Sequence, residues 1–194
     1  MPKFDRTLAV VIGIDNYQNG ITSLRTAAND ASALTQVLRE QHHYNRVWKL
    51  VAPIDSNEAV ATRTQLEDLL TKTLPAEIKA NDRLLFYYAG HGIALNSDDG
   101  PQGYLIPQDA RLGDVTTYLP MPLVEAALTQ LACRHCLVIL DCCFAGAFRW
   151  SSTRKFSVVT EVIHKERFDR FIQDPAWQVI TSLRMTSMRG MPWN

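Results

Sequence analysis

The stretch that decides the fold is LAVVIG, residues 8–13, a continuous apolar run rich in β-branched side chains. Such a run predicts a strand that is covered on both faces, as the central strands of parallel sheets are. After a turn at residues 15–20, apolar side chains recur every three or four positions, which predicts an amphipathic helix. Those side chains are Leu24, Ala27, Ala31, Leu34 and Leu38.

The alternation of strand and helix continues along the chain. Further strands are predicted at residues 47–51, 84–89, 136–140 and 178–182. Thr64 and Glu67 predict a capping box that opens a leucine-rich helix, and residues 122–131 predict another helix. Because strands and helices alternate, we expect an α/β fold, a three-layer α/β/α sandwich around a mostly parallel sheet.

Composition limits the class of protein. The 194 residues suit one domain, and 20 lysines and arginines balance 20 aspartates and glutamates. We therefore expect neither a nucleic acid nor a membrane as a partner. The polar start and the short apolar run that follows it do not form a signal peptide or a membrane span. Four cysteines crowd between Cys133 and Cys143, which suits reduced thiols and a cytoplasmic location.

Two strands lead directly into residues that can carry chemistry. The strand at 84–89 runs into GHG, residues 90–92, and the strand at 136–140 runs into DCC, residues 141–143. Reactive groups gather at the carboxyl ends of strands in open α/β sheets. If the two strands are neighbours, the imidazole of His91 meets the thiol of Cys143.

A thiol beside an imidazole can cleave peptide bonds. The imidazole of His91 favours the thiolate of Cys143 by holding its proton, and it can then protonate the leaving amine. The backbone N–H groups of Gly92 and Cys143 are suited to hold the oxyanion. This chemistry requires no cofactor.

Four motifs together resemble a known family. They are VIGI at 11–14, ANDA at 28–31, YYAGHG at 87–92 and DCCFAG at 141–146. The chain resembles the caspase-like cysteine peptidases, and among them the metacaspases and prokaryotic caspase homologues, from residue 8 to about 146. The resemblance implies that His91 is the general base and that Cys143, not Cys142, is the nucleophile. Their interval of 52 residues agrees with the value of about 50 typical of caspases.

The resemblance also implies a specificity. Asp30 and Asp141 match the acidic pocket positions of metacaspase-like members, and a carboxylate pair suits a guanidinium. We expect cleavage after Arg, then Lys, and not after Asp. The alternatives are a scaffold role for Asp30 on its helix and a capping role for Asp141.

The resemblance also bears on calcium. Many metacaspases need calcium, but no clear ligand set matches here. Asp98, Asp99 and Asp109 are only loosely suggestive.

We expect a single caspase-like peptidase domain over residues 1–194, with the motif-bearing core at 7–148. Residues 149–194 are expected to hold a basic loop, one further strand and an irregular end, and Arg149, Arg154 and Lys155 are candidate self-cleavage sites. Because residues 183–194 lack periodicity, we expect a domain truncated at its C-terminal end or a piece of a longer protein.

The function that follows is a cysteine endopeptidase acting on proteins or peptides. One rival is a catalytically silent caspase-like module that binds partners within a larger signalling protein, with fused or recruited regulatory domains. A second is a small thiol hydrolase or redox protein, since Cys133 and Cys136 have the spacing of a zinc or redox pair. Cys142 is expected to pack as a small hydrophobe on the opposite side of its strand from Cys143.

Overall fold

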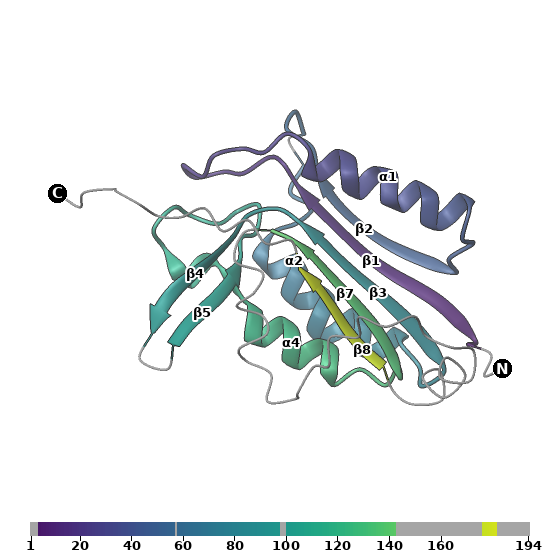
Figure 1. Ribbon diagram of the computed structural model, residues 1–194. Coiled ribbons are helices and arrows are strands. Elements are labelled where there is room, and N and C mark those ends of the chain that lie inside the picture. The colour runs from purple at the N-terminus through teal and green to yellow at the C-terminus, as the bar shows by residue number, and fades with distance from the viewer. Residues whose placement is uncertain (1–3, 57, 98–99, 143–175, 182–194) are drawn as a thin grey trace, which may run out of the picture.

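The main element of the protein is a parallel sheet between helices (Figure 1). The computed structural model describes residues 4–56, 58–97, 100–142 and 176–181. Within these ranges the sheet has five strands in the order β2-β1-β3-β7-β8. The strands are β1 (Arg6–Ile14), β2 (Arg46–Ala52), β3 (Asp82–Ala89), β7 (His135–Asp141) and β8 (Ala176–Thr181). Every pairing in this sheet is parallel.

Helices cover both faces of this sheet. Helix α1 (Ala27–Glu40) lies on one face, and α2 (Arg63–Asp68) and α4 (Met121–Thr129) lie on the other (Figure 1). Helix α2 continues through a π-helical turn (Leu69–Thr73) into α3 (Leu74–Glu77). The predicted α/β/α sandwich is therefore confirmed. No helix in the described ranges is long and apolar enough to cross a membrane.

The buried strands divide their side chains between two cores. On β1, Leu8, Val10 and Ile12 face the core on the α2 and α4 side, while Ala9 and Val11 face the core under α1. Successive side chains of a strand point to opposite faces, so an uninterrupted apolar run is needed where both faces are covered. This is the physical basis of the pattern at residues 8–13.

Helix α1 starts against the end of β1. The carboxylate of Asp15, which is 3% exposed, accepts a hydrogen bond from the N–H of Ala27 at 2.9 Å. A Cβ atom on Gly13 would lie 2.4 Å from the Ala31 Cβ and 2.5 Å from the Ala27 carbonyl oxygen. A glycine at position 13 therefore lets the helix approach the strand closely.

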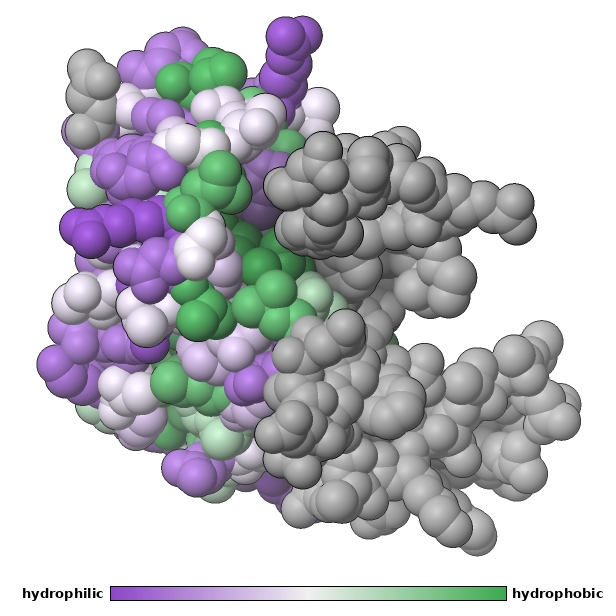
Figure 2. Space-filling model, turned by 90° about the vertical axis from the view of Figure 1, so that its left-hand side faces the viewer, coloured by the Kyte–Doolittle hydropathy of each residue, from purple (hydrophilic) through white to green (hydrophobic). Residues whose placement is uncertain are grey.

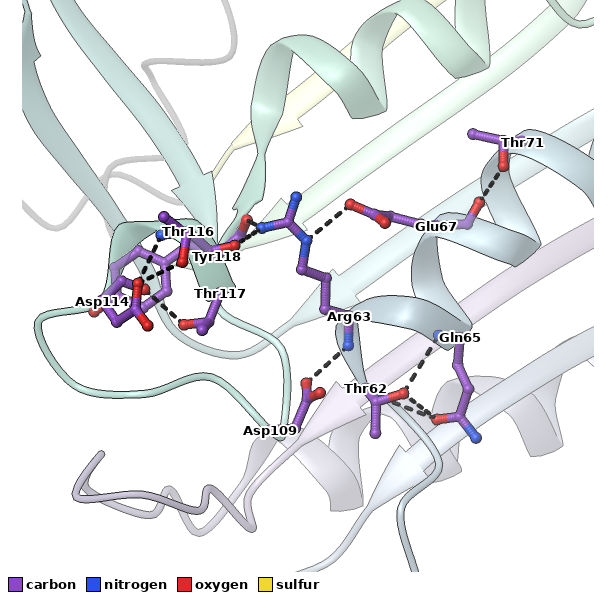
Figure 3. Close-up of polar contacts among 10 residues, drawn as sticks. All are labelled: Thr62, Arg63, Gln65, Glu67, Thr71, Asp109, Asp114, Thr116, Thr117 and Tyr118. Carbon is purple, nitrogen blue, oxygen red and sulfur yellow. Dashed lines mark hydrogen bonds and ion pairs between the residues drawn. The ribbon is translucent and has the colours of Figure 1, made fainter.

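The prediction for the start of the second helix is wrong by two residues. The capping box is formed by Thr62 and Gln65, not by Thr64 and Glu67. Both pairs have the same spacing, and tertiary contacts select the first (Figure 3). Asp109 accepts the N–H of Arg63 at 2.8 Å.

The glutamate of the rejected pair has another partner. Glu67 binds the guanidinium of Arg63 at 2.8 Å, so it is not free to act as a cap. The same guanidinium donates to the carbonyl oxygens of Thr116 and Tyr118 (Figure 3). Arg63 therefore ties the start of α2 to the segment before β6.

A second, antiparallel sheet was not predicted. It contains β4 (Gly92–Ser97), β5 (Gly100–Leu105) and β6 (Leu119–Pro120). The sequence at residues 98–101, DDGP, favours a loop, but β5 begins at Gly100 and pairs with β4. The strands are short and only partly apolar, so they carry a weak periodic signal. The predicted basic loop at 149–155 and the irregular end at 183–194 lie outside the described residues.

One partly buried ion pair should make the fold sensitive to acid. Asp82, with no exposed side-chain surface, binds Arg6 at 2.6 Å and accepts the N–H of Lys79 at 2.7 Å. Burial alone would raise the pKa of the Asp82 carboxyl, but these hydrogen bonds outweigh it and lower the pKa. Because the unfolded chain has the higher pKa, the stabilisation is present above that value and is lost as the pH falls through the lowered one.

The measurement is the urea midpoint of unfolding at about pH 7 and at about pH 3, on either side of the ordinary aspartate pKa. The Asp82→Asn variant should unfold at lower urea at pH 7 and lose less of its midpoint in acid than the wild type does. The control is Asp68→Asn, which removes the exposed pair with Lys72 and should behave like wild type. If the urea midpoint fell equally between pH 7 and pH 3 in Asp82→Asn and Asp68→Asn, Asp82 would not be the source of the acid sensitivity.

Candidate active site

The strands that lead to His91 and Cys143 are neighbours. β3 and β7 pair in parallel with Ala89 opposite Asp141. The Gly90 N–H donates to the Asp141 carbonyl oxygen at 3.3 Å, which extends the pairing by one step. His91 lies two residues beyond this pair at the edge of the sheet, and in the sequence Cys143 follows Asp141 by the same two residues. Cys143 itself lies outside the described residues.

The imidazole of His91 is held on one side. Its Nε2 atom lies 2.8 Å from the carbonyl oxygen of Thr22, and its ring lies 4.7 Å from the ring of Tyr17. A carbonyl oxygen can only accept a hydrogen bond, so this contact requires a proton on Nε2. The Nδ1 atom is then the nitrogen that can take up another proton.

The backbone of His91 is held on both sides. Its N–H donates to the hydroxyl oxygen of Tyr17 at 2.7 Å. Its carbonyl oxygen accepts from the hydroxyl of Tyr88 at 2.9 Å and from the N–H of Ile106 at 3.1 Å. These contacts fix the peptide from which the imidazole projects.

Gly90 is required for a steric reason. A Cβ atom at this position would lie 2.7 Å from the Tyr17 hydroxyl oxygen and 2.8 Å from that of Tyr88. Its backbone does not have a positive φ. The glycine therefore admits the two tyrosine hydroxyls, rather than providing a turn that other residues cannot adopt.

Gly92 begins β4 in a register that leaves its N–H outside the ladder. Gly92 pairs with Leu105, and the carbonyl oxygen of His91 accepts from Ile106. This hydrogen bond joins the two residues that flank the Gly92–Leu105 pair. Gly92 and Leu105 are therefore a non-hydrogen-bonded pair of the antiparallel ladder, and their N–H groups point away from each other. The geometry suits the oxyanion role expected of Gly92.

The two acidic candidates lie near one phenol. Asp30, in the first turn of α1, and Asp141, at the end of β7, are both exposed. Burial raises the pKa of Tyr87 to about 12, with further contributions from the charges of Asp141 and Asp30. Neither carboxylate has a hydrogen bond or ion pair to another described residue. The alternative scaffold role of Asp30 therefore finds no such contact among the described residues, and the turn that Asp141 would cap lies mostly outside them.

The other cysteines are packed inside. Cys142 is 5% exposed in the core on the α2 and α4 side, which confirms its packing role; its orientation relative to Cys143 lies outside the described residues. Cys133 and Cys136 belong to the same core. Burial raises the pKa of Cys133 to about 11 and that of Cys136 further, so both thiols are held in the unreactive protonated form.

Metal ligands do not gather in the described part of the chain. Within it, no group of three or more histidine, cysteine, aspartate or glutamate side chains could hold a metal ion. Asp109, one of the three loosely suggestive residues, caps helix α2. Asp98 and Asp99 lie outside the described residues.

The carboxyl ends of the strands point to the end of the molecule that carries β4 and β5 (Figure 1). Figure 2 looks onto this end, and hydrophobic residues gather near its middle among more hydrophilic ones. This end of the molecule therefore presents apolar as well as polar surface.

Three residues around His91 were not anticipated from the sequence. Tyr17 and Thr22 come from the segment between β1 and α1, and Tyr88 lies within β3. Their contacts join positions that are 74 and 69 residues apart for Tyr17 and Thr22. The Thr22 contact uses a backbone oxygen, so its side chain carries no signal for it.

A family model and a curated relative indicate the same family, and a solved structure shares the fold. The model of the caspase domain matches residues 6–185. A protein named Metacaspase III c from Phaeodactylum tricornutum is 26% identical over 152 residues, which are 71% of this chain and 42% of that protein. The crystal structure of protein GSU0716 from Geobacter sulfurreducens matches with a TM-score of 0.55 and 19% identity, over 71% of this chain and 50% of that one. The chain thus spans less than half the length of the curated relative and half of the solved structure.

Proposed function

The chain belongs to the caspase domain family, whose members are cysteine peptidases that act on proteins, and from this we propose that it is an endopeptidase using Cys143 and His91. The observation that carries the proposal is the parallel pairing of β3 with β7, with Ala89 opposite Asp141. Carboxyl ends of neighbouring parallel strands meet at one edge, and each candidate follows its strand end by the same two residues.

The mechanism follows from the contacts of His91. The hydrogen bond to the Thr22 carbonyl oxygen keeps a proton on Nε2 of His91, so Nδ1 takes the proton of the Cys143 thiol. The thiolate attacks the peptide carbonyl carbon, and the oxyanion is held by the N–H groups of Gly92 and Cys143. The imidazolium then protonates the leaving amine, and His91 activates the water that hydrolyses the thioester. No cofactor takes part in these steps.

We assign the preference for Arg, and then Lys, to Asp30 and Asp141. Both carboxylates are exposed, both lie near Tyr87, and neither has a partner among the described residues. A guanidinium can bind a carboxylate through two parallel hydrogen bonds, whereas an ammonium is a point charge. Substrates with Asp immediately before the cleaved bond would be repelled by these two carboxylates.

The assay compares arginyl, lysyl and aspartyl reporter peptides, with calcium and with a chelator. We expect the wild type to prefer arginyl over lysyl reporters and to leave aspartyl ones uncut. The Asp141→Asn and Asp30→Asn variants should each lower kcat/KM for the arginyl reporter by about 10- to 100-fold, as expected when a hydrogen bond to a charged group worth roughly 1.5–3 kcal/mol is lost.

The matched control is Asp68→Asn, which removes an exposed carboxylate on α2, on the opposite face of the sheet. It should leave kcat/KM unchanged. Equal turnover of aspartyl and arginyl reporters would refute the specificity. No turnover in any condition, with calcium or without it, would instead favour a silent module that binds partners.

A further inference from the structure

Tyr17 contacts the candidate base in two ways. Its hydroxyl oxygen accepts the N–H of His91 at 2.7 Å, and its ring lies against the imidazole at 4.7 Å with an angle of 47° between the planes. Tyr17 is 6% exposed, so water does not compete for these contacts. One side chain thus fixes both the peptide and the ring of His91.

The segment that carries Tyr17 is itself fixed. Asp15 donates its N–H to the Ala52 carbonyl oxygen at 2.9 Å and accepts the N–H of Leu24 at 2.9 Å. The N–H of Gln18 donates to the Gln108 carbonyl oxygen at 3.1 Å. Tyr17 therefore does not depend on His91 for its place.

The same segment supplies the carbonyl oxygen that binds the imidazole. Thr22 lies five residues after Tyr17 and accepts from Nε2 of His91. Tyr88 holds the carbonyl side of His91, and it is placed by its own strand. Of these groups, the Tyr17 ring and the Thr22 oxygen contact the imidazole.

We propose that Tyr17 is a positioning residue that keeps the His91 imidazole against Thr22, with the proton on Nε2 and with Nδ1 available to the thiol. The proposal rests on the proposed function of His91 as the base. Tyr17 acts through His91 and does not exchange a proton in the reaction.

The ionisation of Tyr17 agrees with this role. Burial raises the pKa of its hydroxyl well above the ordinary tyrosine value. The hydroxyl therefore stays neutral throughout the range in which an imidazole and a thiol titrate. Any change in the pH profile of a Tyr17 variant then comes from the cysteine–histidine pair.

The test compares Tyr17→Phe with Tyr118→Phe. Tyr118 is also buried, at 5% exposure, and its hydroxyl oxygen also accepts one backbone N–H, that of Gly113 at 3.0 Å. Both variants lose one acceptor for a backbone N–H and keep the ring, and Tyr17→Phe also loses the hydrogen bond between the Tyr17 and Tyr88 hydroxyls. The urea midpoint of each variant is measured, and activities are compared where both variants are fully folded, so that a difference in activity is not a difference in stability.

We expect Tyr17→Phe to lower kcat by about 10- to 100-fold, because a small displacement of a reacting group has a cost of this order. KM should change less than about twofold, because a positioning residue does not contact substrate. The acidic limb of the kcat/KM profile should move to higher pH, because a loosely held imidazolium stabilises the thiolate less. Tyr118→Phe should change none of these.

A second readout does not depend on turnover. Nitrogen NMR of the imidazole, in a Cys143→Ala background and assigned with a His91→Gln variant, should show the proton on Nε2, and Tyr17→Phe should shift the population toward the other tautomer. If Tyr17→Phe matches Tyr118→Phe in kinetics and in NMR, the proposal is overturned. If the wild type cuts no reporter, the proposed function fails, and the NMR comparison alone decides the role of Tyr17.

Discussion

Cys143→Ala is expected to lower turnover of the arginyl reporter by at least about a thousandfold, because covalent catalysis cannot occur without the nucleophile. His91→Ala should cause a loss of similar order, and the double variant should lose little more, since the two groups act as a unit. The measurement is kcat/KM with an arginyl reporter, on variants with wild-type circular dichroism.

The chain provides a matched control in the adjacent thiol. Cys142 is buried in the core, so Cys142→Ala should lower the urea midpoint slightly and keep most of the activity. Iodoacetamide should label Cys143 and leave Cys133 and Cys136 unlabelled, because burial raises the pKa of both buried thiols. Activity that survives in Cys143→Ala and vanishes in Cys142→Ala would reverse the assignment.

Gly90→Ala should disrupt the site through crowding alone. The added methyl group would meet the hydroxyls of Tyr17 and Tyr88 at 2.7 and 2.8 Å, so the peptide of His91 or the two rings must shift. Crowding of this kind costs about 1–3 kcal/mol of unfolding free energy. A shift of about 1 Å at the base should lower kcat about a hundredfold.

A double variant separates crowding from other causes. Tyr17→Phe removes the nearer of the two oxygens. The double variant, Gly90→Ala combined with Tyr17→Phe, should therefore lose less unfolding free energy than the two single variants lose together. The difference should be about 0.5 kcal/mol or more, as for residues in contact. Exact additivity would mean that the alanine is accommodated without meeting Tyr17.

The strands and the edge of the site could be predicted because their signals are local. Apolar runs mark buried strands, and GHG and DCC follow two of them directly. Since parallel strands end at one edge, the sequence placed His91 and Cys143 on a common side, provided that the strands were neighbours. The pairing of β3 with β7 supplies that condition.

Other features could not be predicted because they depend on contacts between distant segments. Thr62 was selected over Thr64 as the start of α2 by Asp109, which lies 46 residues away from Arg63. The small sheet of β4, β5 and β6 pairs short strands with little periodicity.

The sequence by itself determined the α/β sandwich, the strand ends that carry the reactive residues, and the family resemblance. It could do so because side-chain periodicity and short motifs are local properties of the chain. The tertiary structure alone decided what holds His91, namely Tyr17, Tyr88 and the carbonyl oxygen of Thr22, and why residue 90 is a glycine. The physical reason is that hydrogen bonds and close approaches between distant segments exist only after the sheet has brought those segments together.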